Sequence, residues 1–144
     1  GLSQDPGIRQ DLARLHTLTE IARYMGLRQK ALRATGGDIP GMGNIAKLSM
    51  SIILRLSRDL GLRLLGARGT LHGYDTPGDQ GLQDLPTGAL GGMVTEMALF
   101  AQAPQIYGGT DEIQHNILGE RVLGLPKEPN NDKTTPFREL PKNG

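Results

Sequence analysis

Apolar residues recur every three or four positions in the first third of the chain, between Pro6 and a glycine pair at Gly36 and Gly37. An α-helix completes a turn every 3.6 residues, so this spacing places them on one face of a helix. The stripe consists of Ile8, Leu12, Leu15, Leu18, Ala22, Met25 and Leu32. Asp5 is a good N-terminal cap, and proline is favoured at the first helical position. We therefore predict a long helix that begins at Pro6 and ends at the glycine pair.

A second helical pattern follows a turn at residues 40–43, with Asn44 as its expected cap. Its main stripe is Ile45, Leu48, Ile52, Leu56, Leu60 and Leu64, and Ile53, Leu54 and Leu62 widen it beyond one face. A helix that is apolar on more than one side has to be covered on more than one side. We therefore predict that this helix is the central one.

The rest of the chain predicts a loop and two further helices. Residues 66–84 carry five glycines and no apolar period, which predicts a long loop. Residues 86–101 predict a helix with Met93, Met97 and Phe100 on one face, and the last helix should begin at Thr110 and stop at Gly124 and Pro126. Four helices with short or moderate connections favour an all-α, antiparallel four-helix bundle. We assign it to residues 1–126, followed by a polar, extended or disordered tail over 127–144.

Composition narrows the class of protein. The 144 residues fit one domain, and the absence of cysteine excludes disulfides and thiolate metal sites and favours a cytoplasmic location. A formal net charge of +1 and an aromatic content of 3% disfavour nucleic acid as a partner. No apolar stretch reaches membrane-spanning length. His16, His72 and His115 show no ligand spacing, so we expect no metal.

The junction between the last two predicted helices reads QIYGGTDEIQ, from Gln105 to Gln114. Gly108 and Gly109 allow a tight turn, and Thr110 can cap the helix that follows. Asp111 and Glu112 put negative charge at the positive end of the helix dipole. This favours a neutral polar ligand there over a phosphate. The alternative is that the glycines only reverse the chain between two packed helices. Local spacing alone favours that alternative.

Other polar residues have ordinary explanations. Glu96 is a conceivable base but is better explained as a helix-surface carboxylate. Asp75 and Asp79 flank a Thr-Pro-Gly turn, where turn chemistry accounts for them. The three serines at 49, 51 and 57 have no histidine or aspartate at a recognisable spacing, so a serine nucleophile is not supported.

The same junction, followed by the segment from Ile117 to Gly124, resembles the C-terminal signature of the FAD-dependent acyl-CoA dehydrogenases. The preceding pieces agree in order: the long arginine-bearing helix, the helix that carries Lys47, and the stretch Leu64–Gly69, which is similar to the family's glycine-rich flavin-contacting segment. The resemblance covers the whole chain but only the last third of the family's architecture. The family's N-terminal helical domain, its middle β domain and the first helix of its C-terminal bundle have no counterpart in these residues.

The resemblance implies a reaction, and this sequence departs from the family's catalytic motif at one position. Family members remove the α-proton of an acyl-CoA thioester with a carboxylate, while the β-hydride passes to flavin N5. In many members the base is the Glu of a Tyr-Glu-Gly-Thr motif, and Gly108 stands at that position here. The base therefore lies outside this chain, or the subunit has none. Some members carry Gly or Ala here and a Glu on the bundle's first helix, and others pair a base-less subunit with a competent one.

The resemblance also assigns roles to individual residues. The backbone N–H of Gly108 would still polarise the thioester carbonyl, and the missing Cβ would leave room for a branched or polycyclic acyl group. Arg63 and Ala67 depart from the family's pattern, and Glu112 stands where a Gln often contacts the flavin. The expected cofactor-binding residues are Arg63, Gly66, Ala67, Tyr107, Thr110 and Glu112, and the expected substrate residues are Gly108 and Gly109.

Three hypotheses follow. The leading one is the C-terminal domain of an FAD-dependent acyl-CoA dehydrogenase of fatty acid or lipid catabolism, with its base outside this chain. Its partners would be an acyl-CoA, the rest of the dehydrogenase, further subunits of a homo- or hetero-oligomer (dimer or tetramer) and an electron-accepting flavoprotein. The second is a non-catalytic partner subunit of a heteromeric enzyme. The third is a flavin-independent helical interaction module in which residues 105–112 are exposed and uninvolved.

Overall fold

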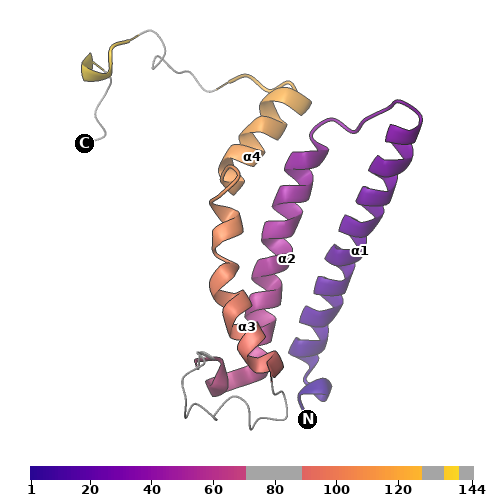
Figure 1. Ribbon diagram of the computed structural model, residues 1–144, viewed down its shortest axis with the longest axis vertical. Coiled ribbons are helices and arrows are strands. Elements are labelled where there is room, and N and C mark those ends of the chain that lie inside the picture. Colours follow the sequence, from indigo (N-terminus) through magenta and orange to yellow (C-terminus); the bar gives the residue numbers. More distant parts are fainter. Residues whose placement is uncertain (71–88, 128–134, 140–144) are drawn as a thin grey trace.

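A computed structural model describes residues 1–70, 89–127 and 135–139, and the regular structure in these ranges is helical. Its α-helices are α1 (Pro6–Ala34), α2 (Met42–Leu65), α3 (Ala89–Phe100) and α4 (Asp111–Ile117). The first two run antiparallel, and α3 and α4 follow one another back along the other side of α2 (Figure 1). The all-α, antiparallel architecture is thus confirmed. Because α3 and α4 share one side of α2, the described helices form an open layer.

The boundaries of α1 follow from local interactions. The Asp5 carboxylate accepts a hydrogen bond from the Ile8 N–H at 2.9 Å, and Pro6 occupies the first helical position. The helix ends where Gly36 takes a φ of 80° and the Gly37 N–H turns back to the Leu32 carbonyl at 2.9 Å. Both predicted ends of this helix are confirmed.

The predicted cap of α2 is wrong. The helix begins at Met42 and is preceded by Gly41 in the left-handed region, at a φ of 71°. A Cβ at Gly41 would lie 2.6 Å from Cδ2 of Leu118, so the chain needs a glycine where it passes beneath the last helix. Asn44 therefore lies inside the first turn, and its side chain bonds elsewhere. The central position of α2 is confirmed, since α1, α3 and α4 all contact it.

The segment after α2 differs in part from the predicted loop. Gly66–Thr70 forms a short 3₁₀ helix, η2, and residues 71–84 lie outside the described part of the chain. The next helix is confirmed over Ala89–Phe100, but its apolar stripe is not the predicted one. Met93 and Phe100 are half exposed, while Thr95 and Ala98 are buried.

The inner face of α3 carries small residues because α2 and α3 approach closely. A Cβ at Gly61 of α2 would lie 2.8 Å from Cγ1 of Val94. Helices that pack this closely leave no room between their backbones for side chains as large as methionine or phenylalanine.

The last helix begins and ends as predicted. The Thr110 hydroxyl accepts from the Ile113 N–H at 3.3 Å, and Gly124 takes a φ of 69°. Between them α4 widens into a π-helical segment, η4 (Leu118–Val122), which the sequence did not predict. Part of the tail lies outside the described residues, and Phe137–Glu139 forms one 3₁₀ turn, η5. The domain boundary at residue 126 stays a prediction.

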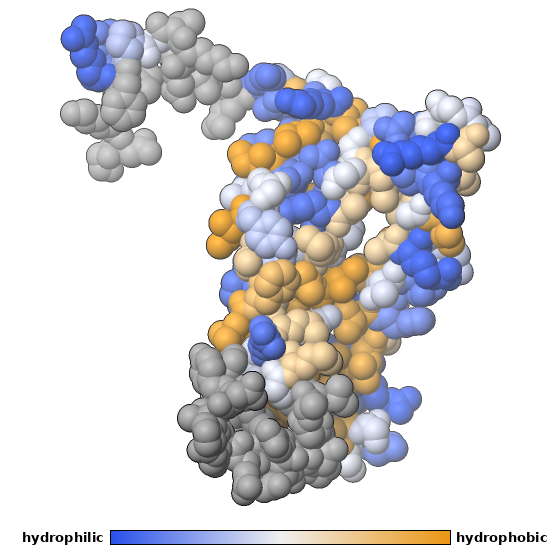
Figure 2. Space-filling view, in the orientation of Figure 1, coloured by the Kyte–Doolittle hydropathy of each residue, from blue (hydrophilic) through white to orange (hydrophobic). Residues whose placement is uncertain are grey.

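The described residues bury few large apolar side chains. The buried apolar ones are Ile8, Leu60, Ala98, Ala101 and Pro104. Figure 2 shows apolar residues gathered over α2 and α3 at the surface, with polar residues toward the edge formed by α1. Within the described part of the chain, no helix combines the length and apolar character needed to cross a bilayer.

Candidate functional site

The turn at Gly108 and Gly109 lies between a 3₁₀ turn, η3 (Ala103–Gln105), and α4. Both glycines take left-handed φ values, 67° and 88°, which other residues adopt only with strain. The N–H groups of Ile106 and Tyr107 both bond to the Ala103 carbonyl, at 2.9 and 3.0 Å. Within the described residues, no hydrogen bond engages the backbone N–H of Gly108. Gly108 is exposed, so this N–H can meet a ligand.

The two glycines differ in what surrounds them. A Cβ built on Gly108 would meet no atom within 4 Å apart from those of its two neighbours in the chain, so open space lies beside it. A Cβ on Gly109 would lie 2.7 Å from Nε2 of Gln114. Gly108 therefore has open space beside it, while the missing Cβ of Gly109 leaves room for the buried side chain of Gln114.

A buried ionic network fastens the start of α4 to α2. The Asp111 carboxylate accepts from Lys47 Nζ at 2.9 Å and from Ser51 Oγ at 2.8 Å, and Arg55 Nη2 lies 3.7 Å away. The Lys47 and Asp111 side chains are each only 13% exposed, and Ser51 is fully buried. Burial alone would raise the pKa of Asp111, but the hydrogen bonds from Lys47 and Ser51 outweigh it and lower that pKa.

This network changes the expected role of Asp111. Its carboxylate turns toward α2 and neutralises Lys47, in addition to lying in the first turn of α4. Of the two predicted first-turn carboxylates, Glu112 is the one that faces solvent. Its own backbone N–H, with the Thr110 hydroxyl, lowers the pKa of Glu112.

A second, uncharged connection joins the same two helices. The side-chain amide of Gln114 donates to the Gly108 carbonyl at 2.8 Å and to the Gly109 carbonyl at 3.4 Å. Its oxygen accepts from Nδ2 of Asn44 at 2.6 Å. Gln114 is 6% exposed, so these bonds are made away from water.

Tyr107 comes directly before Gly108, and its side chain is exposed. It is 49% exposed, and its ring centroid is 6.5 Å from that of Phe100. Ile106, the residue before it, is 69% exposed, so the two residues that precede Gly108 both present apolar surface to solvent. A turn with exposed apolar residues and an unengaged N–H donor suits a flat ring with a polar edge.

The second group of expected flavin residues lies at the other end of α2. An α-helix rises about 1.5 Å per residue, so Arg63 lies roughly 24 Å along the axis from Lys47. Arg63 donates to Asp11 at 2.8 Å and lies 3.6 Å from Asp5. The structure does not bring this group together with the glycine turn within one chain. The resemblance implies that Arg63, Gly66 and Ala67 approach the flavin of a neighbouring subunit, and this implication stays a prediction.

Near each end of α2, the structure has backbone that a flavin could approach. Gly108 has an unengaged N–H beside free space, and Gly66, at a φ of 59°, has no atom within 4 Å of its missing Cβ. These positions fit close approach of a flavin ring. Arg63 fits less well, because two carboxylates already pair with its guanidinium.

The remaining candidates give no site. His16, Glu96 and His115 are exposed, and the described residues contain no group of His, Asp and Glu arranged to hold a metal. His72, Asp75 and Asp79 lie outside the described residues.

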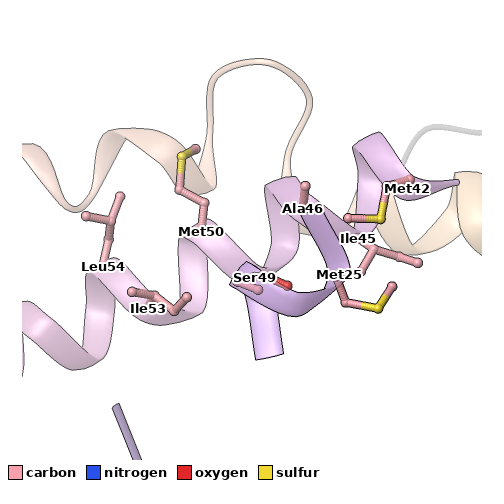
Figure 3. A pocket seen from close by; sticks show the side chains of 9 residues that line it. Met25, Met42, Ile45, Ala46, Ser49, Met50, Ile53 and Leu54 are labelled. Carbon is pink, nitrogen blue, oxygen red and sulfur yellow. The ribbon is translucent and has the colours of Figure 1, made fainter. Parts of the chain in front are cut away.

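An apolar groove between α1 and α2 is a separate feature (Figure 3). It has a volume of about 260 Å³ and is lined by Ala22, Met25, Met42, Ile45, Ala46, Ser49, Met50, Ile53 and Leu54. The Ser49 hydroxyl is its one polar side-chain group, so it offers no charge to bind a nucleotide phosphate.

The chain belongs to the acyl-CoA dehydrogenase family, because the model of the family described as acyl-CoA dehydrogenase, C-terminal domain, matches residues 1–123. Two curated relatives are named acyl-CoA dehydrogenase IpdE1. The one from Mycobacterium tuberculosis is 32% identical over 88% of this chain, and the one from Mycolicibacterium smegmatis is 34% identical over 89%. The chain spans only 29% and 28% of their lengths.

A solved structure shares the fold. It is the ChsE4–ChsE5 complex from Mycobacterium tuberculosis, with a TM-score of 0.67 and 25% identity. The match covers 88% of this chain and 30% of the solved one. The family and fold expected from the sequence are thus confirmed.

Proposed function

We propose that this chain acts as the C-terminal domain of an FAD-dependent acyl-CoA dehydrogenase, with the proton-abstracting base outside its 144 residues. The observation that carries the proposal is the backbone N–H of Gly108, which is unengaged by the described residues and belongs to an exposed turn with open space at the missing Cβ. The α,β-dehydrogenation of a thioester needs such a donor, because negative charge develops on the carbonyl oxygen when the α-proton leaves.

The role of each residue follows from this chemistry. Gly108 would donate its N–H to the thioester oxygen, and Tyr107, Thr110 and Glu112 would border the cofactor. FAD, when bound, supplies the hydride acceptor. Gly108 has no side chain that could take the α-proton, so that proton passes to a base supplied by another segment or subunit. The open space beside Gly108 favours a bulky acyl group.

The test is reconstitution. The chain is co-expressed with the remaining domains, or with a candidate partner subunit, and the product is purified with its bound flavin. We expect non-covalent FAD and bleaching of its visible absorbance on anaerobic mixing with acyl-CoA. An assembly that binds no flavin, or a bound flavin that no acyl-CoA reduces, would refute the proposal. The 144-residue chain alone should bind FAD weakly or not at all, and a stoichiometric yellow complex would refute that part.

A second candidate is a non-catalytic partner subunit. It is favoured by the glycine at position 108 together with the similarity to a complex of two different named proteins. The two candidates differ in the sequence that precedes this domain: a glutamate on a helix before Gly1 that reaches the turn indicates an active subunit. Substitution of that glutamate by Gln should then abolish flavin reduction without loss of FAD.

A further inference from the structure

The Gln114 side chain occupies the space that a Cβ at Gly109 would fill. Its Nε2 lies 2.7 Å from that ideal Cβ position and within hydrogen-bonding distance of both glycine carbonyls. The turn and the side chain therefore need one another. Gly109 admits the amide, and the amide satisfies the carbonyl groups of the turn.

The orientation of the Gln114 amide suits the groups on both of its sides. The NH₂ group of Asn44 donates to Oε1 of Gln114, so the NH₂ group of Gln114 must face the Gly108 and Gly109 carbonyls. If an acceptor replaced the Asn44 amide nitrogen, it would face Oε1 of Gln114, and the Gln114 amide could avoid this repulsion only by reversing its orientation. Its oxygen would then face two carbonyl oxygens, which is repulsive.

The peptide that carries the Gly108 N–H lies between two anchored neighbours. The N–H of Tyr107, on one side, is bonded to the Ala103 carbonyl, and the carbonyl of Gly108, on the other, is bonded to Gln114. With both neighbouring peptide planes held, the peptide between them can turn only by a concerted rotation about ψ of Tyr107 and φ of Gly108, so the direction of its N–H is restricted. The preorganisation that an oxyanion donor requires is of this kind.

We propose that Gln114 and Asn44 are positioning residues, which hold the Gly108–Gly109 turn so that the Gly108 N–H faces the open side. The consequence for catalysis rests on the function proposed above, while the positioning itself does not. Neither residue would touch the substrate, since Gln114 is buried behind the turn.

The experiment uses isotope-labelled 144-residue chain and two variants, Gln114→Met and Asn44→Asp. Met keeps the length of the Gln114 side chain without its amide, and Asp keeps the shape of Asn44 but offers only acceptors. Matched controls are Gln102→Met and Asn116→Asp, at exposed positions. NMR reads the carbonyl ¹³C shift of Gly108 and the ¹⁵N heteronuclear NOE of both glycines.

Both variants should shift the Gly108 carbonyl in the direction of a lost hydrogen bond and lower the NOE of both glycines, and the controls should leave both quantities unchanged. A purely packing role would leave Asn44→Asp silent, because the side-chain volume is kept. A wild-type spectrum of the glycines in folded Asn44→Asp would therefore overturn the inference, even if Gln114→Met fails to fold.

A kinetic arm separates this inference from the proposed function. In the reconstituted enzyme, Asn44→Asp should slow acyl-CoA-dependent flavin reduction about threefold to tenfold, the range that one neutral hydrogen bond supplies, with unchanged FAD content. An unchanged rate would overturn the catalytic consequence. A wild-type assembly that reduces no flavin would refute the proposed function and leave the NMR result standing.

Discussion

The two ends of α2 hold their neighbours in different ways. Near the first end, Lys47 and Ser51 bond to a carboxylate that is 13% exposed, in the first turn of α4. Near the last end, Arg63 pairs with Asp5 and Asp11 of the α1 region through side chains that are 42–47% exposed. Water and mobile ions screen the second set far more than the first. The same type of ion pair should therefore matter for stability at one end and hardly at the other.

The largest effect is expected from Lys47→Met. It leaves the Asp111 carboxylate partly buried without its cation, so the free energy of unfolding should fall by about 2–4 kcal/mol. Urea denaturation at fixed protein concentration measures the change. Lys30→Met, at an exposed position of α1, is the control and should be close to neutral. If Lys47→Met lowered the free energy of unfolding no more than Lys30→Met does, the network would contribute nothing to stability.

The glycine turn provides the next contrast. Gly108→Ala and Gly109→Ala both carry the strain of a left-handed φ, about 1–2 kcal/mol. Only Gly109→Ala also meets Gln114, so it should cost about 1–2 kcal/mol more. Measuring both alanine variants again in a Gln114→Ala background isolates the contact with Gln114. The extra cost of Gly109→Ala over Gly108→Ala should then vanish. Equal costs for the two alanines in the wild-type background would contradict the geometry.

Acid should act on the first end of α2 through Asp111. Its pKa is lowered in the folded chain, so its contribution is fully present above the unfolded value of about 4 and is lost as pH falls through the folded value. Asp111→Asn removes this contribution. The stability difference between the two proteins should therefore shrink as the pH is lowered below about 4. A difference that stays constant down to the acid transition would mean that Asp111 is not the group concerned.

The smallest effect is expected from Arg63→Ala at the other end. Half-exposed ion pairs contribute about 0–1 kcal/mol, and high salt should remove most of that. Denaturation at low and high salt checks both statements. A loss as large as that of Lys47→Met would remove the distinction between the two ends.

The comparison also shows what the sequence could predict. Asp5 and Thr110 were identifiable as caps because a cap bonds to an N–H three residues away. The start of α2 was not, because the need for Gly41 comes from Leu118 on the last helix. The predicted apolar face of α3 was wrong for a similar reason. Gly61, on α2, lets the two helices approach closely, and this contact decides which side chains of α3 fit on its inner face.

The polar network has a recognisable pattern in the sequence. Asn44, Lys47, Ser51 and Arg55 are spaced by three, four and four residues, which places a polar stripe along an otherwise apolar helix. A polar stripe on a central helix predicts a polar partner. The sequence does not say which one, because Asp111 and Gln114 lie 60 to 70 residues further along the chain than the residues they bond to.

The central claim is that the Gly108 N–H serves the thioester carbonyl while the base lies elsewhere. An amide-to-ester replacement at Gly108 exchanges this N–H for an oxygen atom and leaves every side chain unchanged. In the reconstituted enzyme it should slow acyl-CoA-dependent flavin reduction about 10²–10³-fold at unchanged FAD content, as loss of one oxyanion donor does. The same replacement at Gly124, outside the turn, is the control. An unchanged rate for the Gly108 ester would contradict the claim.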